Sequence, residues 1–134
     1  MDNGILAYAG YLPRHRLPHR ELAAQLGVRG GDGARVVASY DEDATTMGVE
    51  AARRIGGRDS RPGSIYFATT TPPYLDKTNA SAIHAALDLG HDGFAADFAG
   101  SARSAVGALW AAAAAGGMAV LSDVRTGLPT SAEE

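Results

Sequence analysis

The sequence predicts an α/β fold with a largely parallel sheet, and three observations lead to this prediction. Apolar stretches of strand length alternate along the chain with amphipathic or alanine-rich stretches of helix length. One of these alternations, over 94–117, runs directly from a strand into a helix. The 134 residues, 46% of them apolar and with a formal net charge of -3, suit one soluble globular domain.

The predicted order is strand, helix, helix, strand, helix, strand, helix, strand. These elements are expected at 4–12, 19–26, 41–55, 64–71, 80–89, 94–98, 102–115 and 118–124. Prolines and glycines mark several boundaries: Pro13 ends the first strand, Gly27 stops the short helix after it, and Pro72 follows the second strand. Strands separated by single helices favour parallel pairing in one sheet.

The stretch 94–117 is the centre of the prediction. Ser101 is placed to cap the helix that follows the strand, and the helix itself consists mostly of alanine and glycine. A helix that is apolar nearly all round is expected to be buried on several sides. Its N-terminus then offers unpaired amides and about half a positive charge, which favours a thiolate, an oxyanion or a phosphate.

Composition excludes several classes of protein. The chain has no cysteine, which removes disulfides, thiolate metal sites and cysteine nucleophiles. Neither nucleic acid nor a membrane is expected as a partner, because the acidic balance is mild and the uncharged stretch 105–121 is interrupted by Gly116 and Gly117. The first residues lack the basic start of a signal peptide, so a cytoplasmic location is predicted.

Three clusters of polar residues have a structural and a functional interpretation. The basic group Arg14, His15, Arg16, His19 and Arg20 suits a solvated loop, or alternatively a phosphate site. The acidic trio at 41–43 suits the positive end of a helix, or alternatively a divalent ion. Histidines at 15, 19, 84 and 91 show no metal-ligand spacing on a common element, so no metal site is expected.

Five blocks of the sequence resemble the N-terminal half of the hydroxymethylglutaryl-CoA synthase family, within the thiolase and ketoacyl synthase III superfamily. They read GILAYAGYLPRHRL, YDEDATTMGVEAARR, IYFATTTPPYLDKTNASAIHAAL, AADFAGSARSAVGAL and VLSDVRTGLPTSAEE. The similarity covers nearly the whole chain and is strongest to the archaeal and bacterial branch. It implies a thiolase-like fold in which two such halves pack around buried helices and the subunits dimerise, with residues 1–134 forming one half.

Two departures from the family pattern bear on activity. The family's cysteine nucleophile aligns with Ala102, and its general acid/base glutamate aligns with Thr70. A methyl group forms no acyl-enzyme, and a threonine hydroxyl does not titrate usefully near neutral pH. Ser101 and Ser104 flank the empty position, but an unactivated serine needs an adjacent base. Ser101 and Arg103 remain as candidate substrate-binding residues.

The chain also stops soon after Val124, where the family continues into a further strand and a second half. It is therefore predicted to be a fragment or one subunit of a split protein, needing that second half or a homo-oligomer. Three functions stay open. The first is a catalytically degenerate half, or pseudoenzyme, that binds a CoA thioester or scaffolds a partner acyltransferase. The second is an active acyl-transfer or condensing enzyme of lipid metabolism that uses another nucleophile, such as Ser101, or only an oxyanion pocket and a bound thioester. The third is a structural interaction module. No covalent cofactor is expected.

Overall fold

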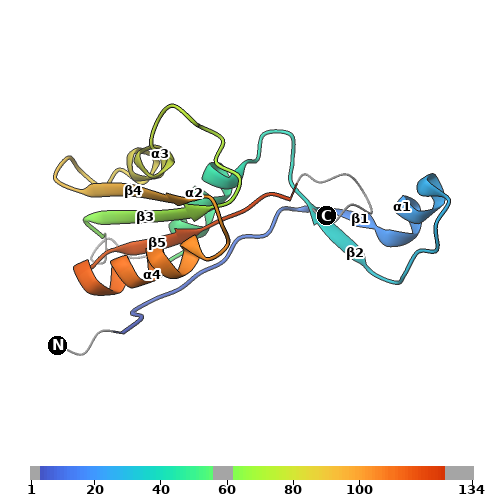
Figure 1. Cartoon of the computed structure of the whole chain (residues 1–134), viewed down its shortest axis with the longest axis horizontal. Helices are drawn as coiled ribbons and strands as arrows, with labels where there is room; N and C mark the ends of the chain where they lie inside the picture. The colour runs from blue at the N-terminus through green and yellow to red at the C-terminus, as the bar shows by residue number, and fades with distance from the viewer. Residues whose placement is uncertain (1–3, 56–61, 126–134) are drawn as a thin grey trace. The chain divides into compact units, whose positions relative to one another are not determined.

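The computed structural model describes residues 4–55 and 62–125, and it divides the chain into two compact units (Figure 1). Of the described residues, 4–11, 43–55 and 62–123 form the larger unit, and 12–42 with 124 and 125 form the smaller one. Residues 56–61, in the loop before β3, and the tail after residue 125 lie outside the described residues.

The larger unit is built on three parallel strands in the order β4-β3-β5. They are β3 (Ser64–Thr69), β4 (Phe94–Ala99) and β5 (Met118–Leu121). Helix α2 (Ala44–Arg53) precedes β3, α3 (Asn79–Ala86) connects β3 to β4, and α4 (Ser104–Ala115) connects β4 to β5. Helices α2 and α3 cover one face of the sheet and α4 covers the other (Figure 1). The predicted α/β layering and parallel pairing are confirmed.

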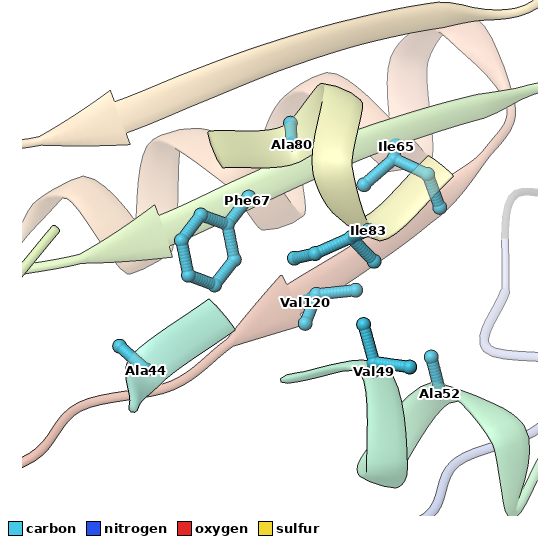
Figure 2. Close-up of a cluster of buried hydrophobic side chains, with 8 residues drawn as sticks. All are labelled: Ala44, Val49, Ala52, Ile65, Phe67, Ala80, Ile83 and Val120. Carbon is cyan, nitrogen blue, oxygen red and sulfur yellow. The ribbon is translucent and has the colours of Figure 1, made fainter. Parts of the chain in front are cut away.

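Alternation along β3 divides the apolar side chains between the two faces. Ile65 and Phe67 point toward α2 and α3, and Val120 of β5 joins them there (Figure 2). Tyr66 and Ala68 point the other way, toward Ala108 of α4. This period of two is what a strand buried on both faces requires.

The core between the sheet and the α2–α3 pair combines large side chains with close backbone approach. Phe67, Ile65 and Ile83 are fully buried in it. Gly48 of α2 lies so close to the sheet that a Cβ atom there would come within 2.9 Å of Val120 Cγ1. Glycine at this position therefore lets α2 approach the sheet more closely than alanine would.

Local chemistry explains where α2 and α3 begin. Asp43 is the N-cap of α2, and it forms a reciprocal capping box with Thr46: each side chain accepts from the other residue's backbone amide. Of the acidic trio predicted at this helix start, only Asp43 caps α2, and the first turn of the helix contains no acidic residue. Helix α3 begins at Asn79, and Asp97 of β4 accepts hydrogen bonds from the amides of Asn79 and Ala80, at 2.7 Å each.

Helix α4 differs from its prediction in two ways. It begins at Ser104 rather than at Ala102, its N-cap is Arg103, and no side chain caps it, so the predicted cap by Ser101 is wrong. Only Ala108 of this helix is buried, so the prediction of burial on several sides is also wrong for this chain. Among the described residues the sheet covers one side of α4, and nothing covers the stripe of Val106, Leu109 and Trp110.

The first predicted strand, at 4–12, is absent as well. This segment forms no strand, and Ile5, Leu6 and Tyr8 are at least 82% exposed. Arg54 of α2's C-cap holds its end, donating to the carbonyl of Gly10 at 2.9 Å and lying over the ring of Tyr11. An apolar pattern forms a strand only when a partner strand supplies the ladder, and within the described chain none pairs with it.

The smaller unit contains two short strands that were not predicted. Strands β1 (His15–Pro18) and β2 (Ala34–Val37) pair antiparallel, with α1 (His19–Leu26) between them. Helix α1 matches its predicted bounds and ends at Gly27 in the left-handed conformation. Four residues of the basic cluster lie on β1 and α1 rather than in a loop, and the fifth, Arg14, directly precedes β1.

Candidate functional site

The carboxyl ends of the three parallel strands meet at one edge of the sheet, and the residues aligned with the family's site lie there. Thr69 is in register with Ala99, and Ala68 is in register with Leu121. Thr70, the turn at 100–103 and Asp123 therefore all follow directly from neighbouring strand ends. Ligands of open α/β sheets commonly bind at this edge.

The turn that leads from β4 into α4 carries Ala102. The amides of Ser104, Ala105 and Val106 already donate to the carbonyls of Ser101, Ala102 and Arg103, respectively, at 3.0–3.3 Å. The Ser104 hydroxyl donates to the Ala99 carbonyl at 3.1 Å, so it is tied into the turn rather than pointed at a substrate. Fewer amides are free at this helix end than the sequence suggested.

The amides still available for a ligand are those of the turn itself. Among the described residues, no acceptor is bonded to the backbone N–H of Ala102 or of Arg103. Ser101, Ala102 and Arg103 are all exposed. Solvent-facing donors at the start of a helix suit an anion or a polarised carbonyl oxygen.

Thr70 lies in a network that the sequence analysis missed, because it centres on Asp123. One carboxylate oxygen of that residue, Oδ1, accepts from the Thr70 amide at 2.5 Å, from the Thr70 hydroxyl at 2.9 Å and from the Thr69 hydroxyl at 3.1 Å. A carboxylate placed directly after an apolar strand was the sequence signal for this residue. The network ties the end of β5 to the end of β3.

A second network beside it is structural. The side-chain amide nitrogen of Asn79 donates to the Tyr74 carbonyl and to Asp97, each at 3.0 Å. Its oxygen accepts from the Tyr74 amide at 3.1 Å. These bonds fix the loop between β3 and α3, and Lys77 lies over the Tyr74 ring in that loop. Asp97 therefore has a structural role, because its carboxylate oxygens bond the start of α3.

The acidic and histidine residues considered as metal ligands do not form a metal site among the described residues. In the described part of the chain, no group of three or more His, Asp or Glu side chains is arranged to hold a metal ion. No helix there is long and apolar enough to span a bilayer.

The sequence matches no family model, but it aligns with curated relatives. The hydroxymethylglutaryl-CoA synthase of Thermococcus sibiricus is 36% identical over 118 residues, which cover 83% of this chain and 33% of the relative. The enzyme of Methanocella arvoryzae is 32% identical over an alignment of 151 positions, gaps included, which covers all of this chain and 44% of the relative. Over most of its length, this chain is similar in sequence to hydroxymethylglutaryl-CoA synthases.

Solved structures agree on the fold. A hydroxymethylglutaryl-CoA synthase complexed with CoA superposes with a TM-score of 0.78 at 19% identity, covering 86% of this chain and 32% of that one. A ketoacyl synthase III from Thermus thermophilus gives 0.72 at 27% identity, covering 83% and 37%. The predicted thiolase-like fold is confirmed. The chain spans 33% of the length of the first of these hydroxymethylglutaryl-CoA synthases and 44% of the length of the second.

Proposed function

We propose that this chain is a catalytically degenerate thiolase-like half that binds a CoA thioester at the carboxyl edge of its sheet. The observation that carries the proposal is the pair of substitutions at that edge, Ala102 and Thr70. Ala102 is exposed beside two free amides, as a nucleophile in that position would be, but it has only a methyl group. Thr70 gives its amide and hydroxyl protons to Asp123.

Thioester binding needs fewer groups than thioester chemistry. The free amides of Ala102 and Arg103 suit the thioester carbonyl oxygen, and the Arg103 side chain adds a positive charge nearby. One structural neighbour holds CoA, and another, related at 27% identity, holds 3-hydroxy-3-methylglutaryl coenzyme A. These ligands support a CoA thioester as the class of molecule to test.

The test separates binding from acylation. The chain is incubated with acetyl-CoA or acetoacetyl-CoA, and binding is measured by calorimetry and covalent adducts by intact-mass spectrometry. We expect measurable binding and no added acetyl mass, because nothing at position 102 attacks the thioester and Ser101 lacks an adjacent base. An acetyl group on a peptide containing Ser101 or Ser104 would establish the active alternative, and absence of binding would leave the structural module.

A second half completes this fold in our proposal. The stripe of Val106, Leu109 and Trp110 on α4 and the segment 4–11 expose large apolar side chains that a monomer would normally cover. Relatives more than twice as long as this chain contain additional polypeptide to do so. We expect the isolated chain to self-associate, and a cognate second half to restore one discrete species by light scattering. A monodisperse monomer would contradict this.

A further inference from the structure

Strand β5 lies at one edge of the three-stranded sheet, and its outer side is unpaired in the described chain (Figure 1). The amide of Ser122 donates to the carbonyl of Ala68 on β3 at 3.1 Å. Because the backbone groups of a strand point alternately to its two sides, Ala119 and Leu121 direct their amides and carbonyls away from β3. Among the described residues, nothing is bonded to these groups. Backbone donors and acceptors therefore face outward along this edge.

Strand β5 has none of the charged or proline residues that commonly protect a sheet edge. Its sequence is MAVL, and Leu121 is 46% exposed. The opposite outer strand, β4, differs because it contains the charged Asp97. An uncharged edge with unpaired backbone groups is a template on which another strand can pair. The outer edge of β5 is therefore suited to a strand partner.

Residues 4–8 have the composition of an inner strand of a sheet. They read GILAY, are all exposed, and form no backbone hydrogen bond among the described residues. In an extended chain Ile5 and Ala7 share one side. Leu6 and Tyr8 share the other, so both sides are apolar. A strand needs this pattern where helices cover both faces of its sheet, as α2, α3 and α4 do here.

These two features do not meet within one copy of the chain. Arg54, the C-cap of α2, donates to the Gly10 carbonyl at 2.9 Å and lies 4.7 Å from the ring centroid of Tyr11. This contact holds the chain just after residues 4–8, which pair with no strand. A second copy has the same unpaired segment and the same unpaired edge. A reciprocal exchange between two copies pairs both edges and closes with two-fold symmetry.

We propose that residues 4–8 of one copy add as a strand to the outer edge of β5 in a second copy, and that the exchange is reciprocal. Each sheet then has a fourth strand, and the backbone groups of Ala119 and Leu121 gain partners. The exchange also buries Leu6 and Tyr8, which are at least 90% exposed in one copy. This inference does not depend on thioester binding. It goes beyond the proposed function by naming the segment and the edge through which the chain self-associates.

Hydrogen exchange over a range of protein concentrations tests the pairing, with light scattering reporting the oligomeric state of each sample. Peptides that cover residues 4–8 and 118–121 should both gain protection as the dimer forms, because their free amides enter a ladder. The peptide containing Leu75 is the control, since this loop residue is 91% exposed and belongs to neither strand. A monomer at every concentration, association without protection of residues 4–8, or protection independent of concentration would overturn the proposal. Protection of β5 alone would mean that another segment occupies its edge, and would overturn it as well.

Two substitutions at Ala7 separate strand pairing from apolar contact. Ala7→Pro removes a backbone donor without making the side chain less apolar, and position 7 is exposed outside any helix or strand, so the monomer should keep its stability. We expect this variant to raise the dimer dissociation constant about tenfold or more. Ala7→Val, which favours a strand, should leave the constant unchanged or lower it. Equal dissociation constants for the two variants would overturn the proposal.

Ala119→Pro applies the same test to the edge of β5. The amide of Ala119 points away from β3, so proline there removes no hydrogen bond within the sheet. The variant should weaken self-association as Ala7→Pro does. Because both substitutions act on one contact, the double variant should associate no more weakly than either alone, and additive effects would overturn the proposal. If thermal melting shows that Ala119→Pro does not fold, the comparison of Ala7→Pro with Ala7→Val decides by itself.

Discussion

The two faces of the sheet are packed very differently. Toward α2 and α3, Ile65, Phe67 and Ile83 are fully buried, and Gly48 draws the helix against Val120. Toward α4, the only fully buried helical residue is Ala108, and Trp110 remains 73% exposed. The first face is a fully packed core, whereas the second leaves Val106, Leu109 and Trp110 of α4 exposed among the described residues. We therefore expect substitutions on the first face to change the free energy of unfolding most. Substitutions on the second face should mainly change self-association.

The largest effect is expected from Phe67→Ala on the fully packed face. Removing this fully buried ring leaves a cavity between the sheet and the α2–α3 pair, at a cost of about 3–5 kcal/mol in the free energy of unfolding. Urea denaturation measures the loss. Phe94→Ala is the matched control, because that ring is 58% exposed and should cost much less. Equal losses would show that the α2–α3 face is not the stable core.

Asp97→Ala tests how the same face is held together. The substitution removes three hydrogen bonds, to the amides of Asn79 and Ala80 and to the Asn79 side chain, and leaves the start of α3 without a cap. We expect a loss of about 2–3 kcal/mol in the free energy of unfolding. Asp92→Ala, at an exposed carboxylate just before β4, should be close to neutral. A similar small loss in both variants would assign the α3 cap no energetic role.

The fully packed face was also the more predictable one from sequence. Its strands and helices fold from local patterns that carry their own signals, such as the Asp43 cap of α2 and the β-branched and aromatic run of β3. The apolar run at 4–12 and the alanine-rich α4 have equally clear patterns, but their predicted burial depends on partners that the described chain does not supply. Periodicity indicates which residues prefer burial, and it cannot indicate what will bury them.

Some residues of the candidate site were predicted from sequence and others were not. Alignment with the family placed Ala102 and Thr70, and the structure puts both at the carboxyl edge. Asp123 was not singled out, because its contact with Thr70 spans 53 residues of sequence and arises only from the parallel pairing of β3 and β5. Short strands β1 and β2 were missed for a similar reason: four residues each are too few to show a period.

Ala102→Cys tests whether the N-terminal end of α4 can stabilise a negative charge. A thiol beside the free amides of this turn should have a pKa below the ordinary value of about 8.5, because the helix N-terminus stabilises a thiolate. The pH dependence of iodoacetamide labelling measures it without interference, since the chain contains no other cysteine.

Ala113→Cys is the control, because it places a thiol at an exposed position well inside the same helix, where the ordinary pKa is expected. If the thiol at position 102 titrates no lower than the one at 113 in folded protein, then the start of α4 is not presented as an anion-binding end. The physical support for thioester binding at this turn would then be lost.

The smallest change in stability, and the sharpest separation of the two faces, is expected from Trp110→Ala. The indole is largely in solvent, so its removal should alter the free energy of unfolding of the isolated chain by no more than about 0.5 kcal/mol. The same substitution removes the largest apolar side chain of the α4 stripe, and self-association measured by light scattering should weaken. Leu75→Ala is the matched control, since Leu75 is 91% exposed but lies on the loop between β3 and α3 rather than on α4. If both variants weaken self-association equally, exposed apolar side chains in general cause the association, and the α4 stripe has no special role. If Trp110→Ala lowers the free energy of unfolding as much as Phe67→Ala does, α4 is already part of a packed core. The two faces of the sheet would then not differ in packing.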